Sequence, residues 1–343
     1  MTLFAATVQA FEAAPVPDLL RRQAVAWLVA GARRRLARSP ADIEQRFVDD
    51  MVGRPVAEHV EAANSQHYEV PSAFFEQVLG PRLKYSCCLY DERDDTLADA
   101  EVRALAETCE HADLKDGQSI LELGCGWGSL SLWMAERYPN ASITAVSNSR
   151  TQREHIMARA AERGLTNLDV VTADMNVFAT EKRFDRVVSV EMFEHMSNWR
   201  ELLKRVRGWL KPEGRAFIHV FTHRSSPYRF EQNDKSDWIA QHFFTGGIMP
   251  SHGLIRRFDD LMQVEAEWVW SGTHYQQTAM DWLANFDGRI DTIRPILKET
   301  YGRDARLWEQ RWRLFFLATA GLFGDSDGRE WQVSHYRLKR VEG

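Results

Sequence analysis

Length, composition and charge set the first limits on this protein. Its 343 residues are 44% hydrophobic and 27% charged, and 43 Lys and Arg against 49 Asp and Glu give a formal net charge of −6. These values are typical of a soluble globular protein with a sizeable core, and the length suits two domains or one large domain with an added element. The mildly acidic balance lacks the basic footprint of nucleic-acid binding, so we expect no nucleic-acid partner.

The N-terminus and the cysteines indicate a cytoplasmic protein. Met1–Ala14 lacks the cationic start of a signal peptide, and the apolar run Ala24–Ala32 is shorter than the roughly 20 residues that span a bilayer. Cysteine occurs at Cys87, Cys88, Cys109 and Cys125. No CxxC spacing is present, so we expect free thiols in a reducing compartment and no metal site.

The first 80 residues are expected to form a helical cap. Apolar residues recur at helical spacing over Pro17–Leu79 and no strand pattern interrupts them. One set spaced to share a face is Leu19, Leu20, Val25, Leu28 and Val29. Arginines crowd Leu19–Pro40, which holds no acid, at Arg21, Arg22, Arg33, Arg34, Arg35 and Arg38. The favoured interpretation is a solvated helix face, and the alternative is a basic surface that contacts anionic lipid.

Strand and helix patterns then alternate through the middle of the chain. Strand-like runs are Ser119–Leu123, Ser142–Val146, Leu168–Thr172, Phe184–Val190 and Gly214–Phe221. Helical periodicity lies between them at Ser129–Tyr138, Ser149–Arg163 and Trp199–Leu210. Such alternation predicts an α/β fold with a doubly wound, mostly parallel, Rossmann-like sheet.

After about Ser225 the pattern changes to loops and aromatic-rich helices. The expected helices are Asp237–Phe244, Met280–Ile296 and Ala305–Gly321. The alternating run Glu330–Leu338 predicts a last strand added antiparallel to the edge of the sheet. We therefore expect a cap over 1–80 and a domain over 81–343, with an insertion at about 225–325 that builds a substrate pocket.

A glycine loop follows the first predicted strand. Gly124, Gly126 and Gly128 let the backbone approach a ligand, and ligands of α/β sheets bind beyond the carboxyl ends of the strands. The spacing G-x-G-x-G differs from the dinucleotide G-x-G-x-x-G, and no Lys-Ser/Thr follows, so NAD and ATP are disfavoured. Glu122, two residues earlier, can meet a cationic or hydroxylated ligand. The loop therefore predicts a cofactor site.

The run ILELGCGWGSLS resembles the S-adenosylmethionine loop of Rossmann-like methyltransferases. By this resemblance Asp174 and the adjacent Met175 contact the adenine of the cofactor. The usual acidic ribose ligand at the end of the second strand is absent, and Ser147 and Asn148 stand there instead.

The polar residues that replace the acidic ribose ligand indicate a resemblance to a narrower family. SNSRTQ, with Gln152, is similar to the same segment of cyclopropane-fatty-acid-synthase-like methyltransferases, which include mycolic acid cyclopropane synthases and coclaurine-type N-methyltransferases. Motifs resembling the family's, in its order, are HYEVPSAFF (67–75), LKYSCCLY (83–90), LELGCGWGSLS (121–131), SVEMFEHM (189–196), FFTGGIMPS (243–251) and HYQQTAMDW (274–282). The resemblance runs from about Asn64 to Leu338. It implies a methyltransferase whose cofactor site is closed by His67 and Tyr68, with contacts from Tyr85 and Ser86.

In the lipid-modifying members a buried bicarbonate acts as the base. Matching the motifs places its ligands at Cys87, Glu194, His219 and Tyr275. The family's isoleucine position is Phe221, and this ring would reshape the pocket while a backbone contact survives. Bicarbonate is therefore expected only with the lipid alternative.

In the coclaurine-type enzymes the EMFEH segment supplies the acid/base cluster, which corresponds to Glu191, Glu194 and His195. Lipid synthases commonly have Gly at the position of Glu191. Residues three and four apart share a helical face, so the three side chains converge if this segment is helical. A protonated amine needs such a group to take its proton, and two neighbouring carboxylates raise one pKa towards neutrality.

We therefore expect an S-adenosylmethionine-dependent methyltransferase that acts on a small, partly aromatic amine. The second hypothesis is a lipid-modifying enzyme that converts an acyl chain to a cyclopropane or methyl-branched product. The third is a cofactor-binding regulatory module without catalysis. A homodimer is left open. Candidates for an aromatic channel or a cage for a cationic amine are Trp238, Phe243, Phe244, Trp268, Trp270, Tyr275, Trp282, Phe315 and Phe316.

Overall fold

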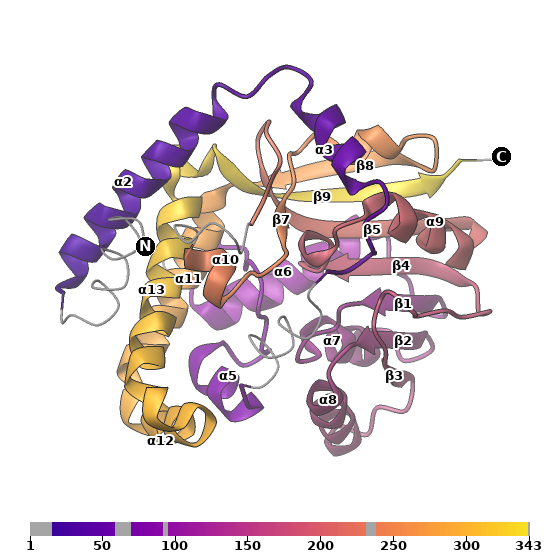
Figure 1. Ribbon diagram of the computed structural model, residues 1–343. Helices are drawn as coiled ribbons and strands as arrows, with labels where there is room; N and C mark the ends of the chain where they lie inside the picture. Colours follow the sequence, from indigo (N-terminus) through magenta and orange to yellow (C-terminus); the bar gives the residue numbers. More distant parts are fainter. Residues whose placement is uncertain (1–15, 59–69, 92–94, 231–237, 342–343) are drawn as a thin grey trace.

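A mostly parallel seven-stranded sheet forms the centre of the protein (Figure 1). The structure is a computed structural model that describes residues 16–58, 70–91, 95–230 and 238–341. The strand order is β3-β2-β1-β4-β5-β9-β8. The strands are β1 (Ser119–Leu123), β2 (Ser142–Ser147), β3 (Leu168–Thr172), β4 (Phe184–Val190), β5 (Leu210–His223), β8 (Met262–Trp270) and β9 (Trp331–Arg340), with a separate short pair β6 (Tyr228–Arg229) and β7 (Ile248–Met249).

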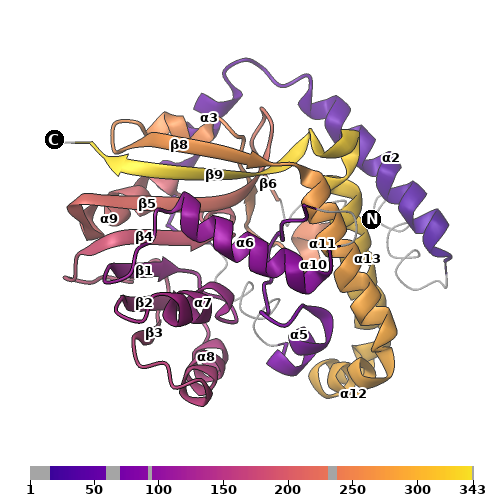
Figure 2. The same cartoon turned by 180° about the vertical axis from the view of Figure 1, so that it is seen from behind.

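Strands β1 to β5 pair in parallel, and this confirms the predicted doubly wound sheet. The order reverses between β1 and β4, which is the switch point where such sheets bind ligands. The connecting helices are α6 (Leu97–His111), α7 (Ser129–Arg137), α8 (Arg150–Glu162) and α9 (Trp199–Trp209). Figures 1 and 2 show α6 and α7 on one face of the sheet and α9 on the other. The switch point therefore lies between two helical layers.

The last strand is antiparallel as predicted, but its predicted position at the edge of the sheet is wrong. Strand β9 pairs antiparallel with β5 on one side and with β8 on the other. Strand β8 was not predicted and forms the edge (Figure 2). Its sequence MQVEAEWVW buries Met262 and Trp270 at its ends, whereas Gln263, Glu265 and Glu267 lie on the more exposed surface. The few buried residues of an edge strand leave a weak pattern in the sequence.

Three long helices stand together at the carboxyl end of the parallel strands (Figures 1 and 2). They are α11 (Gly272–Gly288), α12 (Ile290–Tyr301) and α13 (Ala305–Phe323), next to the short α10 (Trp238–His242). The predicted single helix Met280–Ile296 is wrong, because the backbone leaves the helical conformation at Arg289 (φ −116°, ψ 19°). Helix α11 begins earlier than predicted because the Ser271 side chain caps it by accepting from the Thr273 N–H.

The N-terminal part contains α2 (Asp18–Leu36), α3 (Ile43–Met51) and α5 (Ser72–Val78). The described residues also form short 3₁₀ turns, which are η2 (Phe193–His195), η3 (Leu254–Phe258), η4 (Gly302–Asp304) and η5 (Asp325–Gly328). Helix α2 packs on α13, and none of the described helices is long and apolar enough to cross a membrane. The division into a cap, a domain and an insertion stays a prediction.

The apolar residues of α2 do not share one face as predicted. Val25 and Val29 are buried, whereas Leu19, Leu20 and Leu28 are exposed. The basic surface is also smaller than expected. Arg21 is buried and donates to Gln310, and Arg33 pairs with Asp325. Contact with a lipid surface through the remaining arginines stays a prediction, as does the homodimer.

Candidate active site

A cavity of about 210 Å³ opens at the carboxyl ends of β1, β2 and β4. Most of the predicted site residues line it: Tyr85, Ser86, Glu122, Gly124, Gly126, Ser147, Asn148, Gln152, Asp174, Met175, Glu191, Glu194, His195 and Tyr275. Cys87, Gly128 and His219 lie behind the lining. His67 and Tyr68 fall outside the described residues. Segments far apart in the sequence therefore meet at the predicted place.

The three glycines of the loop have different roles. All three adopt positive φ, which non-glycine residues adopt with strain. A Cβ on Gly124 would lie 2.6 Å from Met192, and one on Gly128 would lie 2.6 Å from Ile156, so these two positions allow close packing. A Cβ on Gly126 would have no atom within 4 Å. The backbone at Gly126 therefore faces open space, as a loop that receives a ligand must.

Two polar groups around the loop fit a hydroxylated, cationic cofactor. Glu122 is 2% exposed and accepts a hydrogen bond from Ser131 Oγ, and burial raises its pKa to about 7. The buried Oδ1 of Asn148 has no hydrogen-bond partner among the described residues. Ser147 Oγ donates to Gln152 Oε1 over 2.6 Å and orders the turn after β2. Because buried polar atoms are rarely left unpaired, Asn148 points to a bound ligand.

Glu191 does not lie on a helix, so the condition under which the three side chains of EMFEH would converge on one helical face is not met. The Glu191 N–H donates to the carbonyl of His219 on β5 over 2.8 Å, so the strand pairing continues through this residue. Its φ is 45°, an uncommon conformation for a non-glycine residue. Only the turn η2 follows, and it carries Glu194 and His195. The two carboxylates reach the cavity because the chain bends sharply after β4.

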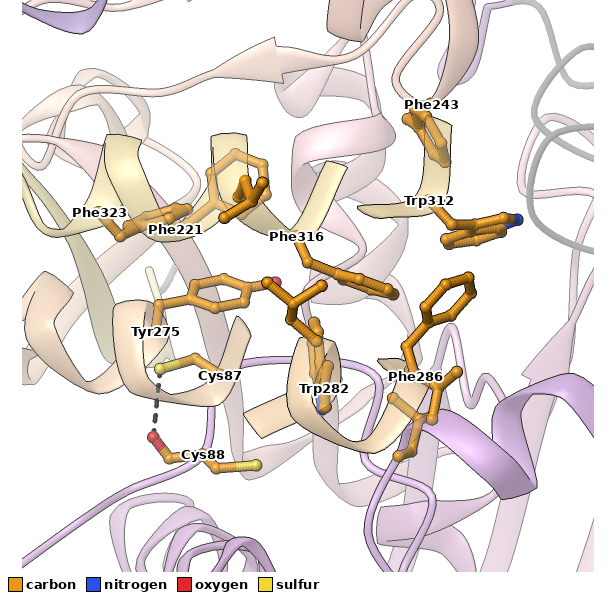
Figure 3. Packing of buried hydrophobic residues seen from close by; sticks show 14 of the residues in the cluster. Cys87, Cys88, Phe221, Phe243, Tyr275, Trp282, Phe286, Trp312, Phe316 and Phe323 are labelled. Atoms are coloured by element: carbon orange, nitrogen blue, oxygen red, sulfur yellow. Dashed lines mark hydrogen bonds between the residues drawn. The ribbon is translucent and has the colours of Figure 1, made fainter. Parts of the chain in front are cut away.

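Three donors hold the Glu191 carboxylate. The Cys87 N–H donates over 2.9 Å, Tyr275 Oη over 2.6 Å, and His219 Nε2 lies 3.2 Å away. Figure 3 shows Tyr275 and Cys87 within the aromatic cluster that also includes Trp282. Burial raises the pKa of Tyr275 well above its usual value, so its hydroxyl stays protonated. It can therefore donate a hydrogen bond to the Glu191 carboxylate.

The carboxyl group of Glu194, unlike that of Glu191, has no hydrogen-bond donor beside it among the described residues. It is 0% exposed, and neither of its carboxyl oxygens has a hydrogen-bond partner among the described residues. Burial, and then the charge of Glu191, raise its pKa well above the usual value, while burial also raises the pKa of Glu191. Because Glu191 has the donors and Glu194 has none, the proton of the pair belongs on Glu194. His195 lines the cavity against Phe244.

Lys84 is a buried part of the site that the sequence analysis missed. It is 2% exposed, and its ammonium donates to Ser86 Oγ and to the Cys87 carbonyl, each over 2.6 Å. Its charge lowers the pKa of Glu191 and so opposes the effect of burial. The lysine is part of the LKYSCCLY motif. A lysine among mostly apolar residues is the feature of the sequence that could have indicated its burial in the site.

Cys87 contributes its backbone and not a reactive thiol. Its Sγ lies 3.3 Å from the Cys88 carbonyl (Figure 3), and burial raises the pKa of the thiol well above its usual value. All four cysteines are buried and free, as predicted.

Fewer than half of the aromatic candidates line the cavity. Of the candidates, those that line the cavity are Phe244, Tyr275, Trp282 and Phe315, and Phe221 joins them. Trp238, Phe243 and Phe316 pack among the helices instead. Trp268 and Trp270 belong to β8, which the sequence analysis did not recognise, and they lie against His111 and His335.

Comparison with known proteins identifies the family. The model of the mycolic acid cyclopropane synthetase family matches residues 57–332. The chain belongs to this family. A curated relative, (S)-coclaurine N-methyltransferase of Thalictrum flavum subsp. glaucum, is 36% identical over 83% of the chain and 80% of its own length. Cyclopropane-fatty-acyl-phospholipid synthase of Escherichia coli K12 is 30% identical over 78% of the chain and 66% of its own length.

Solved structures of similar proteins have the same fold. A coclaurine N-methyltransferase bound to N-methylheliamine and S-adenosylhomocysteine superposes with a TM-score of 0.93 at 32% identity, covering 98% of this chain and 99% of that one. A cyclopropane synthase of Mycobacterium tuberculosis shares the fold, with a TM-score of 0.70 at 21% identity over 83% of this chain. This family member is an S-adenosylmethionine-dependent methyltransferase.

Proposed function

We propose that the enzyme methylates the nitrogen of a small, partly aromatic amine. The observation that carries this proposal is the Glu191 carboxylate, which is held by Cys87, His219 and Tyr275. It provides a base within the protein at the end of the cofactor cavity. The relatives named as N-methyltransferases and the bound N-methylheliamine of the solved neighbour support the same substrate class.

The residues suit this chemistry in three ways. Bound S-adenosylmethionine supplies an electrophilic methyl group, so the protein must mainly orient the amine and exclude water. The rings of Phe244, Trp282 and Phe315 line the cavity and can hold a cationic amine by cation–π attraction. An ammonium has no free lone pair, and Glu191 takes its proton so that the nitrogen can attack.

Glu194 keeps the neighbouring position neutral. Because its proton is retained at neutral pH, it adds no second negative charge beside Glu191. Its protonated carboxyl can accept a hydrogen bond from the substrate ammonium through its carbonyl oxygen, which leaves Glu191 as the proton acceptor of the pair.

Bicarbonate does not fit this site. Three of the groups that the resemblance assigned to it already contact Glu191. A second anion beside the Glu191 carboxylate would add repulsion in a buried site. Phe221 further narrows the space, since it lines the cavity against Phe244. These contacts favour the amine over the lipid alternative.

Replacing Glu191 tests the proposal. Glu191→Gly is compatible with the φ of 45° and removes only the base, so we expect kcat for an amine to fall by about 10²-fold or more. S-adenosylmethionine affinity, measured by calorimetry, should change by less than about twofold, because Glu191 lies beyond the glycine loop. Added acetate should restore part of the activity in the space left by the side chain.

Glu191→Gln is the matched control, because its amide fills the same space and acetate should not rescue it. Full activity of Glu191→Gly without acetate would contradict the proposed role.

A further inference from the structure

Lys84 places a cation in the lining of a cavity that is otherwise rich in acids. Among the described residues that line it, Lys84 is the only lysine or arginine. The carboxyl side chains in the same lining are those of Glu58, Glu122, Asp174, Glu191 and Glu194. Acids suit a cavity that receives the sulfonium of the cofactor and, in the proposed function, an ammonium. A buried lysine repels both cations, so its presence needs another reason.

The backbone around Lys84 fixes where its ammonium lies. Glu101 of α6 is 0% exposed and accepts a hydrogen bond from the Lys84 N–H over 3.1 Å. The side chain then follows its own segment, because the ammonium donates to Ser86 Oγ and to the Cys87 carbonyl. The N–H of the same Cys87 donates to Glu191. The ammonium and the Glu191 carboxylate are therefore both bound to the backbone of one residue.

The charge of Lys84 matters more for Glu191 than for Glu101. Burial raises the pKa of both carboxyl groups, and different groups oppose it. For Glu101, the hydrogen bonds from the Arg82 and Lys84 N–H groups lower the pKa more than the Lys84 charge does. For Glu191, the Lys84 charge has the largest lowering effect on the pKa, ahead of the hydrogen bonds from Cys87 and Tyr275. Lys84 is therefore the main group that favours the ionised form of Glu191.

Most titratable groups around Lys84 and Glu191 carry no charge at pH 7. The acidic ones are Cys87 and Cys88 beside Lys84, Glu194 on η2 and Tyr275 on α11. Burial raises the pKa of each, so each keeps its proton. Burial lowers the pKa of His219 on β5 and of His335 on β9 well below the usual value, so both are neutral. His195 on η2 also lines the cavity, so a titration has to be assigned to Glu191 with a variant.

We propose that Lys84 is a positioning residue that keeps Glu191 ionised until the amine arrives. The proposal rests on the proposed function, in which Glu191 is the base. A base acts only if it has lost its proton at the working pH. Burial favours the protonated form of Glu191, and the charge of Lys84 offsets this effect without contact with the substrate.

The acid limb of the pH profile measures this effect. A dialkylamine is protonated throughout about pH 6 to 9, so its kcat falls at low pH when Glu191 gains a proton. Lys84→Met removes the charge, and Lys84→Gln removes it while keeping hydrogen-bond donors. In both variants the midpoint of the limb should rise by about one pH unit. On the limb kcat should then be about tenfold lower, and at pH 9 it should return to within about twofold of the wild type.

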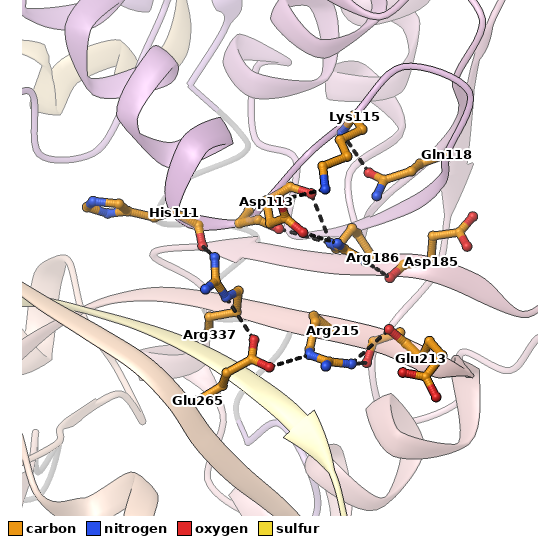
Figure 4. Close-up of polar contacts among 12 residues, drawn as sticks. His111, Asp113, Lys115, Gln118, Asp185, Arg186, Glu213, Arg215, Glu265 and Arg337 are labelled. Carbon is orange, nitrogen blue, oxygen red and sulfur yellow. Dashed lines mark hydrogen bonds and ion pairs between the residues drawn. The ribbon is translucent and has the colours of Figure 1, made fainter.

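A charge-preserving variant and a distant lysine are the controls. Lys84→Arg keeps the cation and should keep the midpoint of the wild type. Lys115 is exposed, pairs with Asp113 over 3.2 Å and precedes β1 at the amino end of the parallel strands (Figure 4). Lys115→Met should change neither kcat nor the midpoint. If Lys84→Met and Lys84→Gln lose activity by one factor at every pH, the role of Lys84 is structural and the proposal is overturned.

A binding measurement identifies the group that titrates. A quaternary N,N-dimethyltetrahydroisoquinolinium ion has no proton to lose and accepts no methyl group, and its affinity should fall when Glu191 is protonated. Calorimetry across the same pH range should show the midpoint of this affinity about one unit higher in Lys84→Gln than in the wild type. Glu191→Gln should show no such midpoint, with or without Lys84→Gln.

Two results would contradict the account in different ways. A midpoint that does not move in Lys84→Gln, or one that persists and moves in Glu191→Gln, would overturn the role of Lys84 alone. This binding profile needs no methyl transfer. Failure of the wild-type enzyme to methylate any amine would therefore overturn the proposed function separately.

Discussion

Single residues in this site derive their chemistry from burial. Glu122 and Glu194 are both enclosed, and burial raises the pKa of each. The side chain of Glu191 is 8% exposed, and its carboxylate is held by three donors and faces the cation of Lys84. The negative charge is therefore stabilised to different extents on these three carboxyl groups. In the proposed function Glu191 is the base among them.

Glu122 makes the stability of the ligand-free protein depend on pH. Its pKa is about 7 in the folded protein against 4.5 normally. Because the folded value is higher, the stabilisation is complete below 4.5 and is lost as the pH rises towards 7. Relative to Glu122→Gln, which still accepts from Ser131, the wild type should lose about 2 kcal/mol of unfolding free energy between pH 5 and pH 8. Urea unfolding of both proteins measures this, and parallel pH profiles would contradict it.

Whole elements were predictable from the sequence where short runs rich in β-branched and apolar residues alternate with helical periodicity. β1, β3 and β4 begin and end at the predicted residues, because such runs, for example FDRVVSV, favour strands. Edge strand β8 was missed because few of its residues are buried. The bend at Glu191 was missed because it depends on pairing with β5. His219 and His335 lie opposite each other, and only the β5–β9 register brings these two positions together.

Helix α2 depends on a close contact with α13. A Cβ on Gly321 would overlap the side chain of Val25. Gly321→Ala should therefore lower the free energy of unfolding by about 1–2 kcal/mol, because Val25 is stiff and the interface is closely packed. Denaturant unfolding measures the change.

Gly31→Ala is the matched control for this interface. Gly31 lies on α2 with no atom within 4 Å of a Cβ, and its replacement should raise stability by up to about 1 kcal/mol. Equal stabilisation by both substitutions would show that α2 does not pack on α13 as described.

At the scale of the whole molecule, one fold serves two kinds of chemistry within the family. The chain matches an N-methyltransferase structure over 98% of its length and a cyclopropane synthase structure over 83%. The cofactor loop, the sheet and the switch point are common to methyltransferases of this architecture. In the proposed function, the acceptor is decided by the walls of the cavity, where Glu191 supplies a carboxylate and Phe221 adds a ring. The sequence motifs predicted where the site lies. The proposal of an amine rather than a lipid acceptor depends on the contacts of Glu191 and Phe221, which the motifs do not give.

The most direct test of this account is mass spectrometry of methyl transfer from labelled S-adenosylmethionine. Heliamine and coclaurine would be offered to the wild-type enzyme in parallel with unsaturated phospholipid vesicles, each with and without bicarbonate. We expect one labelled methyl group on an amine, at a rate that does not depend on bicarbonate. Labelled acyl chains formed only in the presence of bicarbonate, with no labelled amine, would contradict the account and assign the enzyme to lipid modification.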